Sequence, residues 1–156
     1  MKKLTIRKFK LMDSKIIFKI FNNSVELGHT KTRKKIKFDD HYTWLKEKLT
    51  SKKTFIFIGT FNKKTIGYVR FDEIYKRKYN ISIALNNSFV GKGLGTKFLK
   101  NSIVKLTKTR NVEMIRSIVK KKNIHSVNFF LKNNFLEVLK QKTKENDYQY
   151  FKLIIS

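Results

Sequence analysis

Three glycines stand at alternate positions in the loop that follows a short β-prone run, Ile81–Leu85. A helical pattern follows at once, with apolar residues spaced along one face from Leu94 onward. Glycine lets the backbone approach a ligand closely, and the N-terminus of a helix offers free N–H groups and a positive dipole. The arrangement therefore predicts a loop that binds a pyrophosphate, formed by Val90, Gly91, Lys92, Gly93, Leu94, Gly95 and Thr96.

The spacing of these glycines distinguishes between the known types of pyrophosphate-binding loop. A P-loop requires G-x-x-x-x-G-K-[ST] and a dinucleotide fingerprint requires G-x-G-x-x-G, and neither fits. The run G-K-G-L-G-T-K-F-L resembles the acetyl-CoA loop of the GNAT acyltransferase superfamily, whose pattern is Arg/Gln-x-x-Gly-x-Gly/Ala. Val90 occupies the Arg/Gln place, and Gly93 and Gly95 follow in register. This departure affects one side-chain contact and leaves the backbone cradle unchanged.

A second motif lies downstream, in residues 123–135. It resembles the superfamily pattern Asn-x-x-Ser/Ala-x-x-Phe/Leu-Tyr-x-x-x-Gly-Phe, which forms the far wall of the CoA cleft. Asn134 replaces the glycine, and asparagine also tolerates the left-handed conformation of a helix C-cap. Phe130 replaces a tyrosine thought to protonate the departing thiolate. The reaction can proceed without this acid, because a thiol pKa of about 8.5 makes the thiolate a tolerable leaving group near neutral pH. The resemblance implies further cofactor contacts from Asn123, Ser126, Phe129, Phe130 and Lys132.

Composition limits the remaining possibilities. The 156 residues predict one domain, and the 40% hydrophobic content suits a packed core. The chain has no cysteine, which excludes disulfides, thiolate catalysis and zinc–thiolate sites, and its histidines have no metal-ligand spacing. Charged residues interrupt the apolar stretch near the N-terminus, so no signal peptide or membrane span is expected. We therefore expect a cytoplasmic protein that needs no metal.

The net charge of +26 has two explanations. One is an anionic partner such as nucleic acid, a ribosome, a membrane or a phosphorylated metabolite. The other is a genome rich in A/T, because the chain is rich in Lys, Ile, Asn and Phe and has no proline. The lysines are scattered along every segment, which favours the second explanation. Either source of charge favours phosphate-bearing ligands.

Hydrophobic periodicity and turn residues predict alternating strands and helices. Asp13 is expected to cap the first helix, and Asp39 or Asp40 to open the second. The segment between these two helices, 22–37, is expected to be irregular. The expected strands are 3–9, 54–61, 65–72, 79–85, 114–119, 136–140 and 148–155, and the expected helices begin near 13, 39, 94 and 124.

This order matches the GNAT layout, an α/β fold with a mixed, mostly antiparallel sheet and helices on both faces. The resemblance implies that strands Ile81–Leu85 and Met114–Val119 run parallel and splay apart. The pantetheine arm of acetyl-CoA would lie in the gap, against the backbone of Ile83, Ala84 and Leu85. Lys92 and Lys97 are expected to add charge near the phosphates.

The chemistry expected in such a cleft is attack of an amine on the thioester carbonyl. A backbone N–H near Leu85 would stabilise the oxyanion. The amine must be neutral to attack, so a base or a water relay must accept its proton. The strand 79–83 has no carboxylate, which leaves Asp72, Glu73 and His41 as candidate bases. Proximity of the two substrates is expected to supply much of the rate.

Three segments of the N-terminal half bear on the acceptor: Ile17–Asn22, Phe38–Leu45 and Ile66–Asp72. They resemble the branch of the superfamily that acetylates nucleotide-linked amino sugars in pseudaminic and related nonulosonic acid biosynthesis. The resemblance implies that Arg70, His41 and Trp44 face a small, phosphate-bearing amine substrate. Core packing of Trp44 and solvation of Arg70 are the rival interpretations.

Two other classes of function stay open. A protein N-acetyltransferase that acts on ribosomal or other N-termini has a similar N-terminal half, and a basic surface suits ribosomal docking. A non-enzymatic nucleic-acid-binding module is disfavoured, because the phenylalanines recur at core spacing rather than as stacking platforms. The residues leave the oligomeric state open, a homodimer included.

Overall fold

A computed structural model describes residues 3–31, 34–139 and 147–155. The strands are β1 (Leu4–Lys8), β2 (Thr54–Phe61), β3 (Lys64–Tyr75), β4 (Lys78–Leu85), β5 (Met114–Lys120), β6 (Leu136–Glu137) and β7 (Tyr148–Ile154). The α-helices are α1 (Ser14–Glu26), α2 (Phe38–Thr50), α3 (Leu94–Thr109) and α4 (Ile124–Lys132), with short 3-10 turns η1 (Leu11–Asp13) and η2 (Asn87–Phe89). This architecture confirms the predicted GNAT layout.

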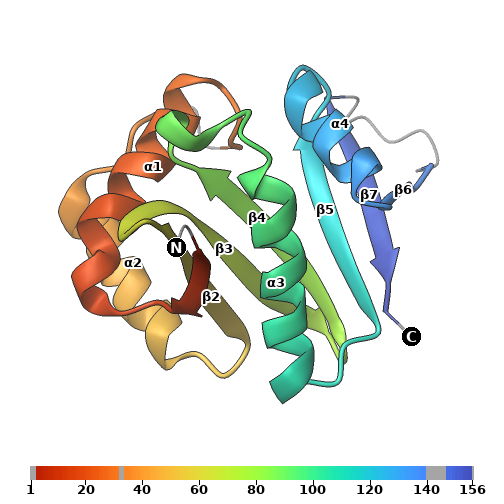
Figure 1. Cartoon of the computed structure of the whole chain (residues 1–156), viewed down its shortest axis with the longest axis horizontal. Coiled ribbons are helices and arrows are strands. Elements are labelled where there is room, and N and C mark those ends of the chain that lie inside the picture. The colour runs from red at the N-terminus through yellow and green to blue at the C-terminus, as the bar shows by residue number, and fades with distance from the viewer. Residues whose placement is uncertain (1–2, 32–33, 140–146, 156) are drawn as a thin grey trace.

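The seven described strands form one sheet in the order β1-β2-β3-β4-β5-β7-β6. Every described pairing is antiparallel except that of β4 with β5. These two strands pair only from Lys78 opposite Met114 to Asn80 opposite Arg116. Beyond that point they separate, and Figure 1 shows the opening between β4 and β5 next to the start of α3. The predicted splay is therefore present.

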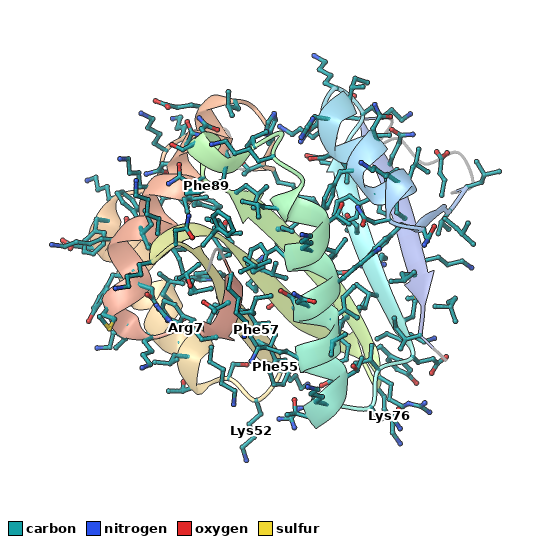
Figure 2. The ribbon with its side chains drawn as sticks, in the orientation of Figure 1. Arg7, Lys52, Phe55, Phe57, Lys76 and Phe89 are labelled. Atoms are coloured by element: carbon teal, nitrogen blue, oxygen red, sulfur yellow. The ribbon has the colours of Figure 1, made fainter. Side chains whose placement is uncertain are left out.

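Helices cover the two faces of the sheet unequally. The larger apolar core lies on the face covered by α3 and α4, and it contains Phe57, Phe71, Phe98 and Phe151. The smaller core lies under α1 and α2, against β2 and β3, and includes Ile17, Leu45, Ile58 and Tyr68. Alternation along the strands therefore assigns odd residues of β4 to the α3 face and even residues to the α1–α2 face. Lysines such as Lys52 and Lys76 extend into solvent around this body (Figure 2).

The structure corrects several predicted boundaries. Helix α1 continues to Glu26, into the segment expected to be irregular, and α2 begins at Phe38, before Asp39. Asp13 does not cap α1 with its side chain; its carboxylate accepts the Lys10 N–H and two bonds from Arg7. A carboxylate six residues after an arginine thus anchors β1 to the first turn. Part of the expected strand 136–140 lies outside the described residues.

Candidate active site

The glycine loop leads from β4 through η2 into α3. Gly91 and Gly93 have φ values of 77° and 74°, the left-handed region where glycine avoids the steric cost of a side chain. Gly93 is the N-cap of α3, and no side chain caps this end of the helix. Gly95 has a different role, because a Cβ there would lie 3.2 Å from Phe129 Cε2 and 3.3 Å from Leu85 Cδ1. The third glycine therefore permits close packing between α3 and α4.

The amides at the start of α3 are available to a ligand. In the part of the chain that the structure describes, no backbone N–H of residues 93–96 donates outside the helix, and the first turn of a helix has no internal acceptor for them. The Val90 N–H, by contrast, donates to the Asn87 carbonyl at 3.3 Å. The candidate diphosphate donors are thus the later residues of the predicted loop, and Val90 is half-exposed. Lys92 and Lys97 are exposed next to them.

The backbone of β4 offers an unpaired edge toward β5. The Asn86 N–H donates to the Ile66 carbonyl at 2.7 Å, and antiparallel ladders alternate bonded and non-bonded pairs. This alternation directs the backbone of Ile83 and Leu85 away from β3, toward the gap. Ala84 lies opposite Tyr68 with its backbone directed at β3, so the expected arm contact at Ala84 is corrected. Ile83 and Leu85 are the residues that present a strand edge in the gap.

Helix α4 forms the other side of the loop. Asn123 is its N-cap and accepts the Ser126 N–H at 3.2 Å, so this motif asparagine shapes the helix. Phe130 is 4% exposed and packs against Phe135 and Phe151, so its ring lies in the apolar core. Phe129 reaches the loop from this helix, next to Gly95. Lys132 is exposed in the last turn of the helix.

Of the three candidate bases, the structure places only His41 near the reacting level of β4. Glu73 lies opposite Tyr79, six residues before Leu85, which is about 20 Å along a strand. Asp72 lies opposite Asn80, and its two oxygens accept bonds from Arg70 Nε at 2.7 Å and Thr54 Oγ1 at 2.9 Å. Both Asp72 oxygens are thus engaged by neighbouring side chains, and Glu73 lies far along the strand from Leu85.

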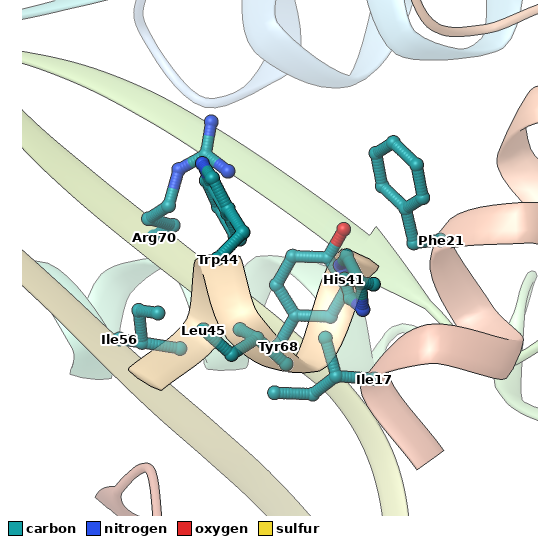
Figure 3. Close-up of a pocket in the computed structure, with 8 residues that line it drawn as sticks. All are labelled: Ile17, Phe21, His41, Trp44, Leu45, Ile56, Tyr68 and Arg70. Carbon is teal, nitrogen blue, oxygen red and sulfur yellow. The ribbon is translucent and has the colours of Figure 1, made fainter. Parts of the chain in front are cut away.

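His41, Trp44 and Arg70 line one pocket, together with Tyr68 and Phe21 (Figure 3). The His41 ring stacks between Phe21 and Trp44, with centroid distances of 5.3 and 5.7 Å. Its Nδ1 is buried without a partner among the described residues. Because Tyr68 lies opposite Ala84, the pocket is level with the unpaired edge of β4. The predicted acceptor residues are thus brought together beside the splayed strands.

Electrostatics in this pocket favour neutral side chains. Burial, and then the nearby Arg70 charge, lower the pKa of His41, so its imidazole is neutral near pH 7. Burial also raises the pKa of Tyr68 to about 12, which keeps its phenol protonated. Arg70 stacks on Trp44 with its Cζ 4.9 Å from the ring centroid. Its Nε is bonded to Asp72 and its Nη2 lies 3.4 Å from Ser82 Oγ, so two of its five N–H donors have partners within the described part of the protein.

The described residues contain no group of three or more His, Asp or Glu side chains arranged to hold a metal ion. None of the described helices combines the length and the apolar character that crossing a bilayer requires.

Solved structures with this fold are numerous. The spermidine N-acetyltransferase of Vibrio cholerae, solved with CoA and spermine, matches with a TM-score of 0.83 at 18% identity, over 97% of this chain and 95% of that one. A ribosomal-protein-alanine N-acetyltransferase from Brucella melitensis matches with a TM-score of 0.82 at 17% identity, over 97% and 99%. A putative acetyltransferase from Salmonella typhimurium, solved with acetyl-CoA, matches with 0.82 at 17%, over 99% and 95%. At these identities the likeness establishes the fold.

Comparison of sequences gives fewer matches than comparison of structures. No individual curated protein matches the chain. The model of the acetyltransferase (GNAT) domain family, however, matches residues 3–136. That range contains the splayed strands, the glycine loop, α4 and the His41 pocket. The chain therefore belongs to the GNAT family of acetyltransferases.

Proposed function

We propose that this acetyltransferase moves the acetyl group of acetyl-CoA to a primary amine inside the splay of β4 and β5. The observation that carries this proposal is the combination of an unpaired β4 edge at Ile83 and Leu85 with free amides at residues 93–96. The edge suits the amide-bearing pantetheine arm, which pairs like an added strand. The amides and the dipole of α3 suit the diphosphate. Acetyl-CoA as donor places the reaction in the cytoplasm.

The reaction then follows from the positions of these groups. The nitrogen of a neutral amine attacks the thioester carbonyl carbon, and the Leu85 N–H donates to the oxyanion that develops. Collapse of this intermediate forms the amide bond and breaks the C–S bond, and CoA leaves as a thiolate. The ammonium proton passes to water or to His41, whose imidazole is neutral and therefore able to accept it. The buried Phe130 cannot donate a proton, so the thiolate leaves unassisted or is protonated by solvent.

For the acceptor we propose the amino group of a phosphate-bearing small molecule, with a nucleotide-linked amino sugar as the leading class. The resemblance of segments 17–22, 38–45 and 66–72 supports this class, and so does the charge of +26, which attracts phosphate and repels a polyamine. The spermidine enzyme shares the fold, but a polycation is normally held by carboxylates. None of the residues that line the described pocket is a carboxylate, and Asp72 is already paired with the lining residue Arg70.

The alternative acceptor is a protein N-terminus, which the fold shared with a ribosomal-protein-alanine acetyltransferase favours. A thiol-release assay with acetyl-CoA separates the classes: it compares nucleotide-linked amino sugars, spermidine and short N-terminal peptides. We expect turnover with the nucleotide sugars. Turnover with peptides alone, or with spermidine alone, would overturn the proposed acceptor and leave the acetyl-CoA site standing. Failure of acetyl-CoA to bind would overturn the enzyme proposal itself.

A further inference from the structure

A row of polar residues crosses the sheet where β4 and β5 begin to separate. Asp72, Asn80, Arg116 and Lys152 lie directly opposite one another on β3, β4, β5 and β7. Directly opposite residues project from the same face of a sheet, here the α1–α2 face. Those two helices pack on β2, β3 and β4, and Arg116 and Lys152 are both partly exposed. The row therefore ends in two cations that solvent reaches.

Within residues 3–31, 34–139 and 147–155, neither of these two cations forms an ion pair with a carboxylate. The ion pairs of the described residues join Arg7 with Asp13, Lys35 with Glu26, and Arg70 with Asp72. Like charges directly opposite each other on an antiparallel pair are destabilising. Arg116 opposite Lys152 is therefore an unfavourable pairing in the free protein. An anion lying between the two side chains would replace this repulsion with an attraction to each of them.

Arg116 is also oriented for such a ligand. Its Nε donates to Asn80 Oδ1 at 2.8 Å, which holds the guanidinium in place. Its two Nη groups donate no bond within the described part of the chain. A planar pair of free N–H donors is the arrangement that recognises phosphate or carboxylate with two parallel bonds. Arg70, which the sequence favoured for this role, differs because its charge is already paired with the Asp72 carboxylate and its Nη2 donates to Ser82.

We propose that Arg116 and Lys152 bind a phosphate group of the acceptor, at the end away from the reacting amine. The proposal rests on the acetyl transfer proposed above. Asn80 lies five residues before Leu85 along β4, which is about 16 Å. An acceptor that reaches both places is elongated, with its amine beside the His41 pocket and its phosphate over this row. A phosphate or diphosphate ester of an amino compound has this form, whereas a polyamine would place positive charge against Arg116.

The test measures binding of uridine diphosphate by calorimetry in the presence of saturating CoA, so that the glycine loop is already filled. We expect the Kd for uridine diphosphate to rise about ten- to a hundredfold in Arg116→Gln, since one charge-assisted pair of bonds is lost. Asn80→Asp should weaken binding similarly, because the new carboxylate, nearly the size of the amide, would pair with Arg116. Lys105→Gln is the matched control: it removes one positive charge from an exposed position on α3, across the sheet, and should leave the Kd within about twofold.

The possible outcomes separate the two proposals. If CoA itself does not bind, the proposed acetyl transfer fails. If CoA binds to all variants alike but uridine diphosphate does not bind, or binds equally to wild type and Arg116→Gln, the phosphate site is overturned. A single-stranded oligonucleotide that binds more tightly than uridine diphosphate, and loses affinity in the same variants, would also overturn it in favour of nucleic acid. If Lys105→Gln raises the Kd for uridine diphosphate as much as Arg116→Gln does, the effect is one of net charge alone, and the phosphate site is likewise overturned.

Discussion

The Asn133 side chain joins the end of α4 to the first turn of α3. Its Nδ2 donates to Thr96 Oγ1 at 3.3 Å and to the Phe129 carbonyl at 2.8 Å. Its Oδ1 is buried without a partner among the described residues. A hydroxyl that accepts a bond from Asn133 keeps its own proton free to donate outward. The contact therefore orients Thr96 beside the candidate diphosphate donors, at the cost of one unsatisfied buried oxygen.

Asn133→Leu should separate binding from stability. It removes the unsatisfied oxygen together with the bond to Thr96, so the free energy of unfolding should change by less than about 1 kcal/mol. The KM for acetyl-CoA should rise several-fold, because Thr96 loses its orientation. Denaturant unfolding and steady-state kinetics measure the two effects. Asn134→Gly is the control: it relieves a positive φ of 66° and should stabilise the fold by about 1 kcal/mol with an unchanged KM. An unchanged KM in Asn133→Leu would contradict the role given to the bond.

Substitution of Gly93 tests the diphosphate cradle. Gly93 has φ 74° and open space around the position of a Cβ, so Gly93→Ala should cost about 1–2 kcal/mol of stability through backbone strain alone. Gly93→Glu carries the same strain and adds a negative charge at the helix N-terminus, where it competes with phosphate. We expect acetyl-CoA affinity to be reduced moderately in the alanine variant and abolished in the glutamate variant, as measured by calorimetry. Equal affinity in the two variants would show that these amides do not hold the diphosphate.

Gly67 holds the edge of β4 in place from the neighbouring strand. A Cβ at Gly67 would lie 2.2 Å from the Ala84 carbonyl oxygen and 3.0 Å from Leu85 Cα. Because both contacts are backbone, Gly67→Ala must displace β4 at the level of the proposed oxyanion donor. We expect kcat to fall by at least about tenfold, since one misplaced donor costs that much or more. Gly28→Asn, at a positive φ of 72° with nothing nearby, is the control and should leave kcat unchanged. A normal kcat in a folded Gly67→Ala variant would argue against Leu85.

His41 should make stability depend on pH. Burial, followed by the Arg70 charge, lowers its pKa in the folded protein below the usual value of about 6.5. Below pH 6.5, His41 therefore takes up a proton more readily in the unfolded chain than in the folded one. The contribution of His41 to the free energy of unfolding is thus fully present above pH 6.5 and decreases as the pH falls below it. Urea unfolding of wild type and His41→Phe between pH 7.5 and 5 measures the effect. We expect the wild type to lose more stability over this range than the variant.

A second histidine contributes to the same pH dependence, and the His41→Phe substitution can also be followed through kcat. His29 also has a pKa lowered by burial and by the charges of His125 and Lys120, so a His29→Gln variant is needed to assign the slope. If His41 also accepts the amine proton, His41→Phe should reduce kcat most near and above neutral pH, where the imidazole is neutral, and the difference from wild type should narrow as the pH falls and His41 becomes protonated. A pH profile of kcat that is parallel in wild type and variant would leave His41 a packing residue.

Part of this structure could be predicted from the sequence, because it depends on residues close together in the chain. Glycines at positions 91 and 93, at the start of an amphipathic helix, need no distant partner to form the turn of the candidate phosphate loop, because left-handed backbone conformation and the helix end supply it. The alternation of strands and helices, and the order of the two motifs, likewise predicted a GNAT fold that the structure confirms. Boundaries were less certain, since α1 extends to Glu26 through packing that periodicity does not record.

Tertiary structure decided which charged residues are available for function. Asp72 and Arg70 read as free functional groups in the sequence, but they lie on one strand face and neutralise each other. Arg116 and Lys152 are 36 residues apart and carry no motif, yet the register of β5 and β7 places them opposite each other. Likewise, only the folded structure shows that Phe130 is buried in the apolar core. Strand register and burial arise from contacts between distant segments, so a sequence alone names the candidate groups and only the folded chain determines which remain unpaired.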